Sequence, residues 1–216
     1  MKNSHEPLEE TNEIDRIHTL KIFENSFYEK DFTKVCGVDE AGRGPLAGPV
    51  VACAVVLPKD AIILGINDSK KLSEKKRELL FDEIHKVAIS IGIGIVDCNT
   101  IDNINILNAT FLAMRKAIES LTVTPDMCLV DGNLLIRELD LPQQSIVKGD
   151  SKSISIASAS IIAKVTRDRL MLQYDELYPE YSFKNNKGYG TKNHKQAILT
   201  HGACPIHRNS FLTKIL

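Results

Sequence analysis

The sequence contains no apolar run long enough to span a membrane, and its first ten residues lack the apolar stretch of a signal peptide. These absences predict a cytoplasmic protein that has no membrane segment. There is no Cys-x-x-Cys pair, and the five cysteines are an odd number, so we expect neither a disulfide framework nor a complete zinc site. Cys204 and His207 have half of a zinc spacing without a second half nearby. Most of the cysteines lie in apolar runs, where a small thiol is usually buried: Cys36, Cys53, Cys98 and Cys128.

Acidic residues are missing from the end of the chain. Residues 181–216 contain no Asp or Glu, whereas residues 1–30 hold seven acids against four bases, and the net charge of the whole chain is −1. A basic segment on a nearly neutral protein predicts an anion-binding surface. A solvated face that binds nothing in particular would have the same composition, so charge alone leaves both interpretations open.

The length and the pattern of the chain predict a single α/β domain. With 216 residues, of which 43% are hydrophobic, the chain is long enough for one well-buried core. β-prone runs occur at 35–40, 50–57, 87–98 and 127–130, with a further strand-like piece from 145. Helical patterns occur at 11–30, 73–86, 102–121 and 153–177, with Ser73 expected to cap the second helix. Strands and helices alternate only after an initial strand cluster, which favours an α/β or mixed-sheet fold.

The most informative stretch is 35–56. An apolar run ends in Asp39 and Glu40, and glycines follow at 42, 44 and 48 before a second apolar run. This pattern predicts a strand, a tight turn with bare backbone, and another strand. Neighbouring residues in a regular strand point to opposite faces, so we expect the first strand to end or bend at Glu40, which would let both acids serve one site.

The same stretch could also form a surface hairpin or a phosphate-binding loop. A surface hairpin would use the acids only to keep an edge soluble, but Asp39 lies within an apolar run, where an unpaired charge is costly to bury. A nucleotide-binding phosphate cradle would need the lysine and hydroxyl ending of a P-loop, which is absent. Two acids before the loop would also repel a phosphate. A divalent metal removes this objection, because it binds carboxylate and phosphate oxygens together.

Further acids follow later strands. Asp131 ends the apolar run at 127–130 and precedes a glycine, which repeats the pattern of Asp39. Since strand ends are where α/β folds place ligands, these acids are expected to converge on one site. Asp150 precedes the long helix and is a candidate ligand or a helix cap. Asp97 also ends a strand and competes as a ligand, whereas Asp168 lies inside the long helix and is expected to pair with Arg167 or another base.

Seven segments in order resemble the type 2 ribonucleases H, and in particular the bacterial ribonuclease HII family. They are GVDEAGRGPLAGPV at 37–50, DSKKLS at 68–73, DGN at 131–133, KGDS at 148–151, ASIIAKVTRD at 159–168, GYGT at 188–191 and HRNSF at 207–211. The resemblance implies a ribonuclease H-like fold, with a central mixed β-sheet flanked by helices and a helical C-terminal extension. We expect three parts in the chain, namely an N-terminal helical extension at 1–30, a catalytic domain at 31–180 and a basic substrate-binding segment at 181–216. Residues before 35 match no family segment.

The resemblance also implies an activity. The enzyme would hydrolyse the RNA strand of RNA–DNA hybrids and cut on the 5′ side of single ribonucleotides in duplex DNA, leaving 3′-hydroxyl and 5′-phosphate ends. The catalytic and metal-binding carboxylates would be Asp39, Glu40, Asp131 and Asp150. Gly42, Arg43 and Gly44 would contact the 2′-hydroxyl, and Tyr189 would pack on the neighbouring sugar. We add Lys148, Lys164, Lys184 and Lys187 as candidates for phosphate contacts.

The chemistry follows from the residue types. Four carboxylates supply the negative charge that holds two divalent ions, with magnesium the default and manganese a plausible substitute. Two such ions activate a water and stabilise the charge on a phosphodiester during hydrolysis. Two alternatives stay open, namely a two-metal nuclease that does not require a 2′-hydroxyl and a catalytically silent nucleic-acid-binding module. The expected partners are RNA–DNA hybrids and ribonucleotide-containing DNA, with the protein acting as a monomer away from membranes.

Overall fold

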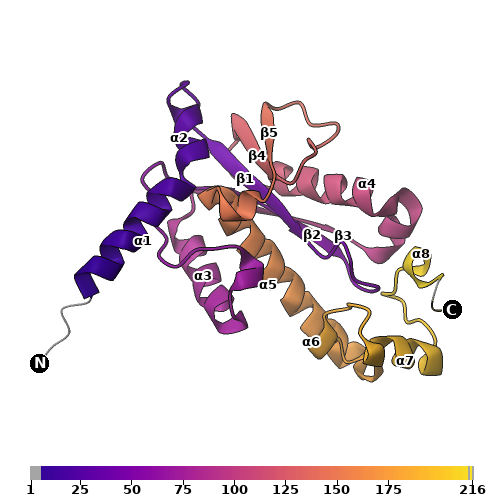
Figure 1. Ribbon diagram of the computed structural model, residues 1–216. Helices are drawn as coiled ribbons and strands as arrows, with labels where there is room; N and C mark the ends of the chain where they lie inside the picture. The colour runs from indigo at the N-terminus through magenta and orange to yellow at the C-terminus, as the bar shows by residue number, and fades with distance from the viewer. Residues whose placement is uncertain (1–5, 214, 216) are drawn as a thin grey trace, which may run out of the picture.

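A five-stranded mixed sheet forms the centre of the computed structural model, which describes residues 6–213 and 215 (Figure 1). The strand order is β3-β2-β1-β4-β5. β1 and β2 are antiparallel, as are β2 and β3, whereas β4 runs parallel to β1 and to β5. The strands are β1 (Val35–Ala41), β2 (Val50–Val56), β3 (Ser90–Val96), β4 (Met127–Asp131) and β5 (Gln143–Ile146). The predicted central mixed sheet is therefore confirmed.

Two long helices cover the two faces of the sheet. Alternate residues of β2 point to opposite faces, so Cys53 and Val55 belong to the core under one helix, and Ala52 and Ala54 belong to the core under the other. The first core is closed by α5 (Ile154–Leu177) and α3 (Glu74–Val87), and the second by α4 (Cys98–Glu119). Because both faces are covered, every residue of β2 is buried.

The helix starts follow local capping chemistry. The predicted cap at Ser73 is confirmed, since its hydroxyl accepts a hydrogen bond from the Lys76 amide. The long helix α5 is capped by Ser153, which accepts from the Ile156 amide, so the interpretation of Asp150 as this cap is wrong. Asp97 caps α4 through the Thr100 amide, 2.7 Å away, and this bond starts the helix four residues before the predicted position.

The predicted single helix at 11–30 is two helices, α1 (Glu6–Leu20) and α2 (Ile22–Tyr28). The break falls at Lys21, which has non-helical backbone angles and whose buried ammonium donates to the carbonyl oxygen of Ala61, 3.1 Å away. Tertiary contact thus interrupts the helical pattern. Residues 1–5 of the expected N-terminal extension lie outside the described part of the chain.

Three short helices follow α5: α6 (Phe183–Asn186), α7 (Lys192–His201) and α8 (Asn209–Leu212). They pack around a small core that includes Met171, Tyr181 and Phe183, and one isolated bridge joins Ala47 to His207. This helical segment therefore rests against the loop that links β1 to β2 as well as against α5 (Figure 1). Lys214 of the expected basic segment lies outside the described residues. Within those residues, no helix is long and apolar enough to cross a membrane.

Candidate active site

Two buried arginines bind the backbone of the loop between β1 and β2. Arg208 donates hydrogen bonds to the carbonyl oxygens of Gly42, Arg43, Pro45 and Gly48, at 2.7 to 3.0 Å. Arg167 on α5 donates to the carbonyls of Pro49, Ala47 and Lys187, at 2.9 to 3.0 Å. A guanidinium offers five donors in a fixed plane, which suits a loop whose carbonyls converge on one point. The two arginines therefore fix the path of the glycine-rich loop.

Sequence reasoning missed both arginines as site residues. Arg208 is fully buried and Arg167 is 1% exposed. A signal for Arg208 existed, because a region without Asp or Glu offers a buried arginine no carboxylate close in sequence. Such an arginine needs acceptors from another part of the fold, which here are the carbonyls of the loop. Both residues also lie within segments that carry the family resemblance.

Asp39, Glu40 and Asp131 meet where two central strands end. The last residue pair between β1 and β4 is Val38 with Val130, so Asp131 follows directly beside Asp39. β4 then leaves the sheet at Gly132, which has a positive φ of 101°. Beyond this point β1 has no strand neighbour among the described residues on the β4 side, so that side of Asp39 and Glu40 is not covered by the sheet.

The predicted end or bend of the strand at Glu40 is wrong. β1 stays paired with β2 through Ala41, opposite Val51. Asp39 therefore faces α5, where it lies beside Ser160, and Glu40 leaves toward the other face, above α4. Both acids nevertheless repel the Asp131 carboxylate, because β4 ends at this level and leaves room between them.

Asp150 reaches the same region from a short 3-10 turn at Gly149–Ser151. The turn is fastened to β4, since the Gly149 amide donates to Asp131 Oδ1 at 2.7 Å. On its other side the Lys70 ammonium lies 3.9 Å from Asp150 Oδ2. The structure thus brings the four predicted carboxylates together from β1, β4 and this turn.

The electrostatics of the cluster show an excess of negative charge. Burial, and then the charges of Glu40 and Asp131, raise the pKa of Asp39 well above its usual range. Burial and Asp131 also raise the pKa of Glu40, against the opposing effect of Arg43. Burial raises the pKa of Asp150 as well, and repulsion from Asp131 adds to it. Each shift means that the ionised form lacks compensating positive charge.

The four side chains could serve as ligands of a hard divalent cation, because they offer carboxylate oxygens whose negative charge is not balanced by nearby positive charge. The side chains now use protein partners instead. Asp39 accepts from the Glu40 amide at 2.7 Å, and Glu40 pairs with Arg43 at 3.5 Å. Across residues 6–213 and 215, no three His, Cys, Asp or Glu side chains are close enough to hold one metal ion together. Cation binding would therefore require these side chains to exchange partners.

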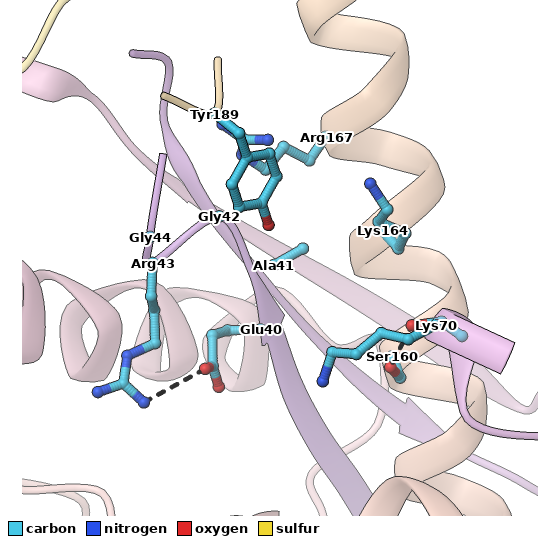
Figure 2. A pocket seen from close by; sticks show the side chains of 11 residues that line it. Glu40, Ala41, Gly42, Arg43, Gly44, Lys70, Ser160, Lys164, Arg167 and Tyr189 are labelled. Atoms are coloured by element: carbon cyan, nitrogen blue, oxygen red, sulfur yellow. Dashed lines mark hydrogen bonds and ion pairs between the residues drawn. The ribbon is translucent and has the colours of Figure 1, made fainter. Parts of the chain in front are cut away.

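A cavity of about 230 Å³ adjoins the carboxylate cluster at Glu40, the member of the cluster that lines it (Figure 2). Glu40 and Lys70 line one side, and Tyr189 and Lys164 line another. Of the residues predicted to contact substrate, those that line it are Gly42, Arg43, Gly44, Lys164 and Tyr189. Five lining residues were not predicted in this role: Ala41, Ser69, Lys70, Ser160 and Arg167.

The two glycines of the loop have different roles. Gly42 has a φ of 98°, and a Cβ at this position would collide with the Arg167 guanidinium, so glycine is needed here for packing. Gly44 is exposed, and a Cβ there would meet only the ring of Tyr189, at 3.8 Å. The backbone at Gly44 is therefore the part of the loop that is open to a ligand.

The predicted lysines are spread more widely. Lys164 lines the cavity, but its ammonium pairs with Asp168 at 2.6 Å, so Asp168 pairs with this base and not with Arg167. Lys148 is exposed beside the turn that carries Asp150. Lys184 pairs with Asp175 at 3.8 Å, and the Lys187 ammonium donates to the carbonyl of Lys184. Lys148, Lys184 and Lys187 do not line the cavity.

Comparison with known proteins identifies the family. The family model for ribonuclease HII matches residues 36–214, which include every element of this site. The chain belongs to the ribonuclease HII family. A ribonuclease HII of Clostridioides difficile is 59% identical over 204 residues, which cover 94% of this chain and 80% of that relative. Membership makes the chain a metal-dependent endoribonuclease of the ribonuclease H type, whose family activity is the hydrolysis of RNA paired with DNA.

Solved structures agree with the ribonuclease HII fold. The ribonuclease H2 of Pyrococcus horikoshii superimposes with a TM-score of 0.71 at 29% identity, covering 85% of this chain and 97% of that one. A ribonuclease HIII solved with Mn²⁺, Bst-RNase HIII, has a TM-score of 0.65 at 19% identity, covering 78% of this chain and 63% of that one. The second likeness concerns the fold alone. Together they confirm the expected ribonuclease H-like architecture.

Proposed function

We propose that this ribonuclease HII cuts the RNA strand of RNA–DNA hybrids and also cuts on the 5′ side of single ribonucleotides in duplex DNA, leaving 3′-hydroxyl and 5′-phosphate ends. The observation that carries the proposal is that the carboxylate cluster adjoins the cavity formed by Gly44 and Tyr189. A scissile phosphate beside the carboxylates would have its sugar next to this backbone. The 2′-hydroxyl is the one sugar group that distinguishes RNA from DNA.

Asp39, Glu40, Asp131 and Asp150 would hold two divalent cations, Mg²⁺ or Mn²⁺. Bound cations would supply an activated water and would stabilise negative charge on the phosphate. Two observations support this assignment. The acids are mutually repelling and raise one another's pKa, and the ribonuclease HIII with the same fold was solved with Mn²⁺.

The protein groups around the cluster have separate tasks. The exposed Gly44 backbone would contact the 2′-hydroxyl, with Gly42 and Arg43 shaping that contact, and Tyr189 would pack against the next sugar. Tyr189 is 46% exposed beside Gly44, so its ring is available for such packing. Arg43 would release Glu40 when a cation binds and would then face the substrate backbone. Lys148, Lys164, Lys184 and Lys187 would contact phosphates, which position a duplex without reading its sequence.

The basic segment at 181–216 would serve as the substrate-binding part of the chain, beside a catalytic domain at 31–180. Its described bases gather in the helical segment that supports the glycine-rich loop, so a duplex bound there would lie next to the cavity. We propose that the enzyme acts as a monomer in the cytoplasm, where its five cysteines, all free thiols in this structure, would stay reduced.

The test is cleavage of a DNA duplex that contains one ribonucleotide, with Mg²⁺, Mn²⁺ or chelator, by the wild type and by Asp39→Asn. We expect metal-dependent cutting on the 5′ side of the ribonucleotide by the wild type, and a loss of at least about 10²-fold in the variant. An all-DNA duplex is the control. Equal cutting of that control would contradict the role of Gly44, and binding without cutting would contradict the enzymatic proposal.

A further inference from the structure

The N-terminal helices bury a carboxylate against the start of α5. Glu24 of α2 is 3% exposed. Its Oε1 accepts hydrogen bonds from the Ser153 hydroxyl at 2.5 Å, the Ser155 hydroxyl at 2.6 Å and the Ser155 amide at 3.1 Å. Its Oε2 has no hydrogen-bond partner within the described chain. The proposed function assigns no task to this residue.

A buried carboxylate is costly unless its surroundings compensate for the charge. Here three hydrogen-bond donors from Ser153 and Ser155 compensate for the charge, and so does the positive end of the 24-residue helix α5, where these two residues lie. The favourable position of Glu24 therefore depends on where α5 begins. Conversely, Glu24 fixes that beginning, because Ser153 is also the residue that caps the helix.

The start of α5 is bonded directly to the turn that carries Asp150. The amides of Lys152 and Ser153 donate to the carbonyl of Gly149, at 2.9 and 2.8 Å. The Gly149 amide in turn donates to Asp131 at 2.7 Å. A continuous series of hydrogen bonds thus runs from α2 through the turn that carries Asp150 to the Asp131 carboxylate.

The same helices also hold the opposite side of Asp150. Three side chains bind the backbone of residues 61–66, at 2.7 to 3.1 Å: Glu13 at Gly65, Arg16 at Ile66 and Lys21 at Ala61. This segment leads into the turn Ser69–Lys71. There the Ser69 hydroxyl lies 2.9 Å from that of Ser160, and Lys70 lies 3.9 Å from Asp150. The Gly149–Ser151 turn and the segment that carries Lys70 are therefore both tied to the N-terminal helices. In Figure 1, α2 lies beside the start of α5.

We infer that the N-terminal helices position Asp150 for catalysis and that Glu24 is the residue through which they do so on the side of α5. Glu24 touches neither the cavity nor the carboxylates, so it acts through Ser153 and the Gly149–Ser151 turn. The inference rests on the proposed catalytic role of Asp150. It gives a task to the part of the chain that precedes the family segments.

The experiment compares Glu24→Ala and Glu24→Gln with the wild type and with Glu29→Gln, a change at an exposed glutamate that ends the same helix. Circular dichroism checks folding, hydrogen exchange reports on residues 149–155, and cleavage of an RNA–DNA hybrid gives kcat and KM. For Glu24→Ala we expect exchange in 149–155 to rise and kcat to fall, each about tenfold, with KM unchanged. Glu24→Gln keeps an acceptor oxygen and should lose less, while Glu29→Gln should match the wild type.

Two results would overturn the inference. One is full kcat in both Glu24 variants, and the other is faster exchange spread evenly over the sheet, which would mean general destabilisation. If Glu24→Ala does not fold, the smaller change in Glu24→Gln decides between the same outcomes. Asp150→Asn is the separate control for the proposed function. Full activity in Asp150→Asn would contradict the proposed site, whereas full activity in Glu24→Ala beside an inactive Asp150→Asn would contradict only the positioning role.

Discussion

Arg208 Nη2 lies 2.7 Å from the carbonyl oxygen of Gly42, a residue that precedes it by 166 positions in the chain. The same guanidinium binds three further carbonyls of the glycine-rich loop. Through Arg208 the C-terminal segment therefore supports the loop that lines the cavity, in addition to carrying basic residues. A change at Arg208 is expected to affect stability and cleavage together.

Replacing Arg208 by lysine tests this relationship. Arg208→Lys keeps the positive charge but cannot span carbonyls that lie apart, so buried acceptors lose their donors. We expect the free energy of unfolding to fall by about 2 to 4 kcal/mol and hybrid cleavage to fall even where the variant is folded. Urea unfolding and cleavage assays measure the two effects. Lys86→Arg, on the exposed face of α3, is the control. Unchanged stability of Arg208→Lys would refute the supporting role.

The two loop glycines are expected to respond differently to alanine. Gly42→Ala places a Cβ at positive φ against Arg167 and should reduce the free energy of unfolding by about 2 kcal/mol or more. Gly44→Ala has room and should change stability by less than about 1 kcal/mol. It should nevertheless reduce cleavage at a single ribonucleotide, because the methyl group covers the exposed backbone. Thermal unfolding and cleavage separate these effects, and equal behaviour of both variants would argue against distinct roles.

The stability of the metal-free protein is expected to depend on the charge of Asp39. Because its pKa is raised in the folded state, ionisation of Asp39 destabilises the fold as pH rises above the usual range of an aspartate. In chelator at neutral pH, Asp39→Asn should therefore be more stable than the wild type, by about 1 kcal/mol or more. The difference should shrink at acidic pH, where the wild-type carboxyl is protonated. Thermal unfolding over a pH series measures it, and a less stable variant at neutral pH would contradict the prediction.

His207 is expected to make the protein sensitive to acid. Burial, and then His194, lower its pKa to about 4. Its Nε2 lies 3.0 Å from Nε2 of His194, which leaves no room for protons on both nitrogens. Because the unfolded state takes up this proton first, the stabilising contribution of the neutral ring is lost as pH falls from about 6.5 toward 4, by up to about 3 kcal/mol.

The measurement is the free energy of unfolding between neutral pH and pH of about 4, for the wild type and His207→Gln. The variant should lose less stability on acidification, because it cannot take up the extra proton on unfolding. His18→Gln, at an exposed site on α1, is the matched control and should follow the wild type. If His207→Gln follows the wild type as well, the acid sensitivity has another source.

The sequence by itself determined the elements and caps that depend on neighbouring residues. The apolar runs became β1, β2 and β4, and the cap at Ser73 formed as predicted, because strand alternation and capping need only a few adjacent residues. The series of family segments also identified the ribonuclease HII family. The four carboxylates were named from the same segments, and their catalytic roles stay a prediction.

Only the tertiary structure decided which distant segments meet. It extended β1 past Glu40, since β2 continues to supply hydrogen bonds up to Val51. It placed Arg208 under the glycine-rich loop and Glu24 against α5. These two contacts join residues 166 and 129 positions apart, and they satisfy buried charges and carbonyls that have no partner in their own segment. Local patterns do not reveal which remote group supplies the missing donor or acceptor, because that choice is made by packing of the whole chain.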